Sequence, residues 1–100
     1  MVNYEQGDII KVEGIPKPLL VVSKNLFNKE GMAMCCPLFE KSASHPLHIN
    51  VSDIEGSKYV ALVEQTKLVD ISFRGYSVLS RISYYDVMNV SDALQALFEY

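Results

Sequence analysis

The chain has 100 residues, of which 49% are hydrophobic and 21% are charged. This is the composition of one ordinary globular domain, 1–100. The formal net charge of −3 differs from the positive charge of most nucleic-acid-binding domains, although a local cluster of Lys and Arg would still permit such binding. The sequence has neither the start of a signal peptide nor an apolar stretch long enough to cross a bilayer. We therefore expect a cytoplasmic protein with no membrane segment.

The two cysteines and two histidines are not spaced like metal ligands. Cys35 and Cys36 are adjacent, so on a strand they point to opposite faces, and a disulfide between them would be strained. We expect reduced thiols, with at least one in the core. His45 and His48 are three residues apart, which on a strand also places them on opposite faces. Because no cysteine lies near them at zinc-site spacing, the sequence predicts neither a metal nor another cofactor.

Short apolar segments separated by turns predict a protein built mainly of β-strands. The run Leu19–Val22 has no polar residue, which is typical of a central strand buried on both faces. Pro37 has no backbone N–H, so we expect the preceding strand to stop there. One helical turn is expected around Leu26 and Phe27. The expected strands are, in chain order, 9–13, 19–22, 32–36, 47–51, two short strands or one bent strand within 59–69, and 78–82.

The spacing of the apolar residues changes after residue 83. Ser83 followed by Asp86 resembles a capping box, and we expect a helix from about Tyr84 to Glu99. Strands without intervening helices, followed by one helix, predict a mainly β fold: a small, strongly bent antiparallel barrel with a C-terminal α-helix. We expect Phe98 to pack on the core. The apolar residues that repeat at helical spacing are Val87, Val90, Leu94, Leu97 and Phe98.

Several segments in this order resemble the MazF/PemK family of bacterial toxins. Gly7–Val12 (GDIIKV) is similar to the family's opening "GD(I/L)(V/I)xV", and Lys17–Ser23 (KPLLVVS) is similar to its "RPxLVLS". Asn28 stands where the family has "(F/Y)N". Glu64–Asp70 (EQTKLVD) resembles "(D/E)Qxxx(I/L)D", and Arg74 matches a basic residue shortly after it. The resemblance covers nearly the whole chain.

This resemblance implies a fold, an activity and partners. The fold would be an SH3-like barrel, and the active form a homodimer with an RNA groove across its interface. The activity would be sequence-selective, metal-independent cleavage of single-stranded RNA such as mRNA. The partner would be a cognate antitoxin whose flexible tail blocks the groove.

The chain departs from the family pattern at several positions. Lys17 replaces the family's arginine, which keeps the charge but loses the bidentate fork. Phe39 and Glu40 stand where the family favours Thr or Ser, and the loop 14–16 is shorter than its counterpart. These departures leave a second interpretation open, a non-catalytic toxin-fold protein. It would be either an inactive relative or, like the gyrase-poisoning CcdB toxins, an inhibitor of a protein target through C-terminal residues such as Tyr100.

Cleaving RNA without a metal requires a base for the 2′-hydroxyl, an acid for the leaving oxygen and positive charge at the phosphate. By resemblance, Glu64 is the candidate base and Lys17 the candidate phosphate contact. His48 is a candidate proton carrier, since histidine titrates near neutral pH. Each of these three is also explained as an exposed strand or turn residue.

Four further residues are candidates for RNA binding: Gln65, Lys67, Arg74 and Phe39. Gln65 would either read a base edge or orient a loop. Phe39 would stack on a base, as in single-strand binders, or anchor its loop. Arg74 would contact RNA or fix its loop by pairing with Asp70.

Overall fold

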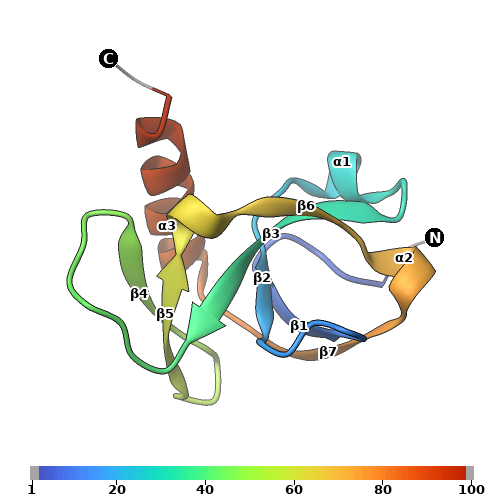
Figure 1. The fold of residues 1–100 in the computed structure, drawn as a ribbon, viewed down its shortest axis with the longest axis horizontal. Helices are drawn as coiled ribbons and strands as arrows, with labels where there is room; N and C mark the ends of the chain where they lie inside the picture. Colours follow the sequence, from blue (N-terminus) through green and yellow to red (C-terminus); the bar gives the residue numbers. More distant parts are fainter. Residues whose placement is uncertain (1–2, 99–100) are drawn as a thin grey trace.

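The computed structural model describes residues 3–98, which form a sheet of short strands with one long helix beside it (Figure 1). All strand pairs are antiparallel, so the predicted mainly β fold with a C-terminal helix is confirmed. Among the described residues, no helix is long and apolar enough to span a membrane. The elements are β1 (Asp8–Val12), β2 (Leu19–Val21), α1 (Asn25–Asn28), β3 (Met32–Phe39), β4 (His48–Ser52), β5 (Lys58–Leu62), the short 3₁₀ turn η1 (Val63–Gln65), β6 (Lys67–Asp70), α2 (Ile71–Arg74), β7 (Tyr76–Arg81) and α3 (Tyr84–Ala96).

The strands follow the order β4–β5–β3–β2–β1–β7, and β6 pairs with β3 outside this path. The path does not close through a full ladder. A single bridge between Asp53 and Ile82 joins the end beyond β4 to the end beyond β7. Next to it, the Ile54 N–H donates to the Arg81 carbonyl at 2.9 Å. The barrel expected from the sequence is therefore a strongly bent, incompletely closed sheet.

Strand β3 continues through Pro37 to Phe39, so the expectation that it stops at the proline is wrong. Its first part, Met32–Cys35, pairs with β6, and its last two residues pair with β5. The Leu38 N–H donates to the Pro18 carbonyl at 3.0 Å, toward β2. Because N–H directions alternate along a strand, the N–H that Pro37 lacks would point between β6 and β5. The proline therefore removes no ladder bond at this position.

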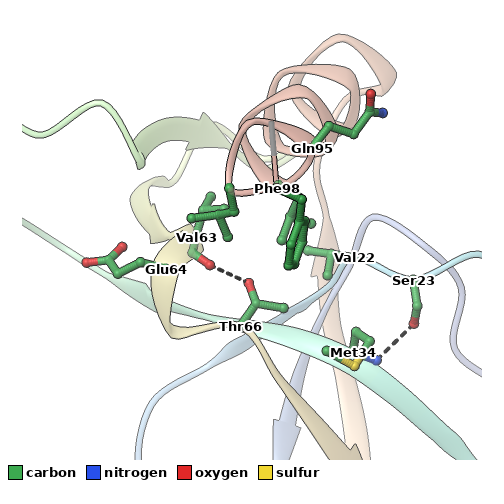
Figure 2. A pocket seen from close by; sticks show the side chains of 10 residues that line it. Val22, Ser23, Met34, Val63, Glu64, Thr66, Gln95 and Phe98 are labelled. Carbon is green, nitrogen blue, oxygen red and sulfur yellow. Dashed lines mark hydrogen bonds between the residues drawn. The ribbon is translucent and has the colours of Figure 1, made fainter. Parts of the chain in front are cut away.

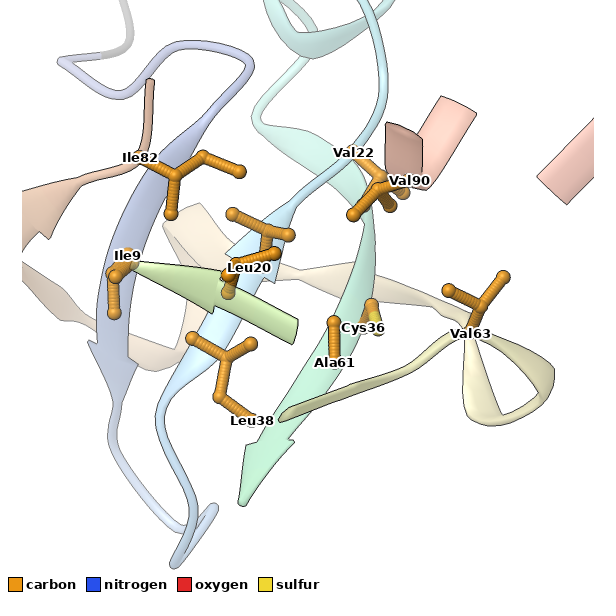
Figure 3. Packing of buried hydrophobic residues seen from close by; sticks show 10 residues of the cluster. Ile9, Leu20, Val22, Cys36, Leu38, Ala61, Val63, Ile82 and Val90 are labelled. Atoms are coloured by element: carbon orange, nitrogen blue, oxygen red, sulfur yellow. The ribbon is translucent and has the colours of Figure 1, made fainter. Parts of the chain in front are cut away.

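Apolar residues bury both faces of the central strands. Because neighbouring side chains alternate, Cys35 and Cys36 belong to different clusters. Both cysteines are buried and free, as expected for reduced thiols. The first cluster (Figure 3) contains Ile9, Leu20, Val22, Cys36, Leu38, Val51, Ala61, Val63, Ile82 and Val90. The second contains Tyr4, Ile10, Val12, Leu19, Val21, Ala33, Cys35, Val69 and Ile71.

Helix α3 begins as the sequence predicts. The Ser83 hydroxyl accepts a hydrogen bond from the Asp86 N–H at 3.2 Å, which caps the first turn. The Asp86 carboxylate accepts from the Ser52 N–H at 2.9 Å and so ties the helix to β4. Val90, 2% exposed, places the helix on the first core cluster.

The far end of α3 differs from the expectation. The helix ends at Ala96, and the predicted end at Glu99 lies outside the described residues. Phe98 is 82% exposed and Leu97 40% exposed. The expectation that Phe98 packs in the core is therefore wrong, because the chain at this point extends past the edge of the first cluster.

Candidate functional site

The turn η1 places Glu64 beside the first residue of β4. Strand β5 ends with Leu62 opposite His48, and the chain then turns back, so that His48 Nε2 lies 2.7 Å from Glu64 Oε2. This hydrogen bond raises the pKa of His48 above its ordinary value and lowers the pKa of Glu64. Both shifts favour an imidazolium beside a carboxylate. The Glu64 side chain is 35% exposed, so a ligand in solution can reach it.

The second nitrogen of the same ring contacts the loop between β3 and β4. His48 Nδ1 lies 2.8 Å from the Ala43 carbonyl and 2.9 Å from the Ser42 hydroxyl. The His45 ring stacks against it, with 4.8 Å between ring centres. The expectation that the two histidines lie on opposite faces is wrong, because His45 belongs to the loop and not to the strand. Within residues 3–98, no three His, Cys, Asp or Glu side chains gather as metal ligands.

Lys17 and Phe39 form a second pair. The Leu38 N–H donates to the Pro18 carbonyl, which places the residue before Pro18 opposite the end of β3. Lys17 Nζ lies 4.8 Å from the centre of the Phe39 ring, which is the geometry of a cation–π contact. The Lys17 ammonium group therefore lies over the face of the Phe39 ring.

The two pairs occupy the same face of the sheet. Ile49, Ala61 and Leu38 stand in register on β4, β5 and β3 and pack on the first core cluster. Since side chains alternate along each strand, their neighbours His48 and Phe39 point to the opposite face. The structure therefore brings the three candidate catalytic residues, together with Phe39, to one side of the molecule.

The other candidate RNA-binding residues, Gln65, Lys67 and Arg74, follow Glu64 on the segment from η1 to α2. Lys67, opposite Cys35 on β3, and Arg74, in α2, line a hollow of about 440 Å³ together with the loop residues 14–16. Gln65 is exposed on η1, next to Glu64. No hydrogen bond or ion pair among the described residues joins the lining of this hollow to the His48–Glu64 pair.

The expected pairing of Arg74 with Asp70 is wrong. Asp70 instead caps α2, where its Oδ1 accepts from the Phe73 N–H at 3.3 Å. The three ion pairs found among residues 3–98 do not include Arg74. Its charge is therefore available to the hollow that it lines.

An apolar pocket on the other side of η1 was not predicted from the sequence. It has a volume of about 350 Å³ and lies between the end of α3, strand β3 and the two residues that follow β2 (Figure 2). Phe98 forms one wall, and Glu64 stands at the rim with its carboxylate turned away (Figure 2). The signal for it was the apolar spacing of α3 continuing past the packed part of the helix. Its other lining residues are Val22, Ser23, Met34, Val63, Thr66, Leu94, Gln95 and Leu97.

Comparison with known proteins connects this arrangement to one family. The family described as "PemK-like, MazF-like toxin of type II toxin-antitoxin system" matches residues 2–98. The chain is also 33% identical, over 89 residues, to the endoribonuclease toxin ChpB of Escherichia coli strain K12. That match covers 72% of this chain and 74% of ChpB.

Solved structures show the same fold at lower identity. MazF in a MazE–MazF crystal structure from Deinococcus radiodurans superposes with a TM-score of 0.85, at 19% identity over 97% of both chains. An endoribonuclease from a mycobacterial species gives a TM-score of 0.79, at 17% identity over 96% of this chain and 91% of the other. From the near-complete family match and the identity to ChpB, the chain belongs to the PemK-like, MazF-like toxins of type II toxin–antitoxin systems.

Proposed function

We propose that this protein is the toxin of its pair and cleaves single-stranded RNA, with Glu64 and His48 as the proton-transfer groups. The observation that carries the proposal is the 2.7 Å contact between His48 Nε2 and Glu64 Oε2 on a solvent-accessible face. ChpB, a relative 33% identical to this chain, is named an endoribonuclease toxin. The cleavage we propose is sequence-selective and uses no metal ion.

The pair supplies both halves of the acid–base chemistry. Glu64 accepts the proton of the attacking 2′-hydroxyl as the 2′-oxygen bonds to phosphorus. His48 donates its Nε2 proton to the 5′-oxygen as the bond from phosphorus to that oxygen breaks. The products are a 2′,3′-cyclic phosphate and a 5′-hydroxyl. The proton on Glu64 then returns to His48 across their hydrogen bond, which restores the starting state.

Positive charge near the phosphate comes from Lys17 in this proposal. Its contact with Phe39 is weak enough for a phosphate to displace, since a cation over an aromatic ring at an exposed site gains only about 0.5–1 kcal/mol. When the lysine moves, the Phe39 ring becomes free to stack on a base. Lys67 and Arg74 would contact the RNA backbone farther along, and Gln65 would contact a base beside the cleaved bond.

The remaining parts of the proposal concern assembly and location. We propose a single-domain cytoplasmic protein that acts as a homodimer and is neutralised by a cognate antitoxin. Support for the antitoxin comes from the family and from the fold shared with MazF of the MazE–MazF complexes. The gene beside this one should therefore encode a small antitoxin, and co-expression of the two proteins should yield a complex.

RNA cleavage in EDTA tests the catalytic proposal directly. The folded, antitoxin-free protein should cut a long single-stranded RNA at discrete sites and leave cyclic phosphate ends. Glu64→Gln should abolish the cuts, whereas Glu55→Gln, at an exposed carboxylate before β5, should leave them unchanged. Intact RNA after incubation with the wild-type protein would reject the proposal.

A second candidate function is a non-catalytic inhibitor that binds a protein target such as gyrase. One observation favours it: Phe98, 82% exposed, borders the apolar pocket at the end of α3. In that case Phe98→Ala should remove toxicity in cells while Glu64→Gln leaves it intact. The ribonuclease proposal predicts toxicity lost with Glu64→Gln.

A further inference from the structure

Residues 40–44, the exposed first part of the loop between β3 and β4, are hydrogen-bonded to the rest of the described molecule through one side chain. Residues 40–46 are exposed. Among the described residues, the hydrogen bonds that reach 40–44 both end on His48 Nδ1, from the Ser42 hydroxyl and the Ala43 carbonyl. The opposite ring nitrogen bonds Glu64. One imidazole therefore connects an exposed loop to the carboxylate that we propose as the base.

We propose that His48 is also a positioning residue: a clasp that holds the loop in one of two ways, selected by the protonation of its ring. The part of this inference that concerns catalysis rests on the proposed function of Glu64. The clasp itself depends only on the contacts of the ring with Ser42, Ala43 and Glu64.

The two states follow from the number of N–H groups on the ring. The Ala43 carbonyl and the ionised Glu64 are both pure acceptors, so bonding both requires a proton on each nitrogen, which is the imidazolium. A neutral ring has one N–H, and ionised Glu64 retains it at Nε2. The bare Nδ1 then repels the Ala43 carbonyl but accepts from the Ser42 hydroxyl, 2.9 Å away. When His48 loses its Nδ1 proton, the bond to the Ala43 carbonyl is therefore replaced by a bond from the Ser42 hydroxyl, and the loop is held in a second way.

None of the groups around the ring takes the place of His48 in this switch. Glu64 faces it from η1, and the Glu64 hydrogen bond raises the pKa of His48. His45 stacks on it from the loop, but its own Nδ1 accepts the Leu47 N–H at 3.1 Å and makes no bond to Ser42 or Ala43. On the β5 side the residue in register is the apolar Leu62.

The clasp has a consequence for the proposed reaction. In the imidazolium, the Nδ1 proton is bonded to the Ala43 carbonyl, and the Nε2 proton faces Glu64, on the side where the proposed reaction takes place. The loop therefore stays fastened while Nε2 transfers its proton. Through its carbonyl, the loop fixes which nitrogen takes part in the chemistry.

Two measurements without RNA test the clasp. Nitrogen-15 NMR of the histidines reports the protonation of Nδ1 and Nε2. Trypsin cleavage after Lys41, near the start of the loop, reports how often the loop opens. The cleavage rate is divided by that of a peptide of residues 38–47 at each pH, from about pH 6 to about pH 9, a range that starts near the ordinary histidine pKa of about 6.5.

The variants separate the two holding states. In the wild type, normalised cleavage should rise as pH passes the His48 titration seen by NMR, because the charge-assisted bond to the Ala43 carbonyl is replaced by a weaker neutral bond from the Ser42 hydroxyl. Ser42→Ala removes the hydroxyl-held state, so above that titration its cleavage should exceed that of the wild type by roughly two- to tenfold, the worth of one hydrogen bond. His48→Gln should be cleaved quickly at every pH. The matched control His45→Gln should follow the wild type.

Three outcomes would overturn the clasp. These are cleavage that does not change with pH in the wild type, Ser42→Ala matching the wild type above the titration, and His48→Gln as resistant as the wild type. If His48→Gln does not fold by circular dichroism, Ser42→Ala decides alone. RNA cleavage is measured in parallel: a working clasp in a protein that leaves RNA intact rejects the proposed function and not the clasp.

Discussion

Lys17 Nζ lies 4.8 Å from the centre of the Phe39 ring, although Lys17 precedes β2 and Phe39 is the last residue of β3. The charge that would meet a phosphate is therefore placed on an apolar surface in the free protein. Lysine there is a mobile point charge, whereas arginine would keep a planar fork able to stack and to bind phosphate with two bonds. This difference leads to the first prediction.

Lys17→Ala should reduce kcat/KM for RNA cleavage by about 100-fold, because it removes one charged donor from the transition state. Lys17→Arg should cleave at least as fast as the wild type, since arginine both stacks on Phe39 and binds phosphate. Initial rates on a short labelled RNA measure both effects. Equal rates for wild type and Lys17→Ala would show that the lysine has no part in the reaction.

The His48–Glu64 pair should make stability depend on pH. Because the folded state raises the pKa of His48 from 6.5, its contribution is complete below about pH 6.5 and is lost as pH rises through the raised pKa. The lowered pKa of Glu64 acts at the other end: its contribution is complete above about pH 4.5 and is lost as pH falls through the lowered pKa.

The free energy of unfolding of the wild type minus that of His48→Gln should therefore be largest between about pH 4.5 and about pH 6.5. Urea unfolding of both proteins at a series of pH values measures this difference. A difference that is constant from acid to alkaline pH would mean that the pair carries no linked protonation in the folded state.

Asn28 should be required for stability and not for chemistry. It is fully buried, its Nδ2 donates to the Ser23 carbonyl at 3.0 Å, and its Oδ1 accepts from the Ser23 hydroxyl. Asn28→Ala should lower the free energy of unfolding by about 1–3 kcal/mol, because the partly buried carbonyl and hydroxyl of Ser23 lose their bonds. Cleavage per folded molecule should not change. Asn50→Ala, at an exposed position of β4, should change stability by less than about 0.5 kcal/mol.

Both thiols should be inert in the native protein. Burial raises the pKa of Cys35 and that of Cys36 to about 12, so almost no thiolate exists near neutral pH. An aromatic disulfide reagent should report no reactive thiol under native conditions and two after unfolding in urea. Rapid reaction of the native protein would show that the strands around β3 open easily.

Periodicity in the sequence predicts the strands and the start of α3, because alternation and helical spacing are local properties. The sequence does not show that β3 continues through Pro37, because the cost of a proline depends on which neighbouring strand its missing N–H would face. Only the ladders on both sides of β3 reveal that. The exposure of Phe98 is likewise not visible in the sequence, because helical spacing identifies an apolar face without showing how far along the helix the core packs against that face.

The candidate site was predicted as separate residues and not as an arrangement. The resemblance selected Glu64 and Lys17, while His48 was selected by its chemistry alone. The contact between His48 and Glu64 depends on the register of β4 with β5 and on the turn η1. The stacking of His45 on His48 depends on the course of a loop, which no strand pattern predicts.

The position of β3 in the sheet affects the chain as it is synthesised. One edge of β3 pairs with β2, which precedes it, but the other edge pairs with β5 and β6, which follow it. About 30 residues separate the end of β3 from the end of β6, and at about 5–20 residues per second they take roughly 2–6 s to translate. During that interval each nascent chain carries an unpaired apolar strand edge, which is prone to join another chain. Messenger RNAs cut upstream of the codons for β6 would yield truncated proteins in which the edge of β3 that β6 covers stays unpaired.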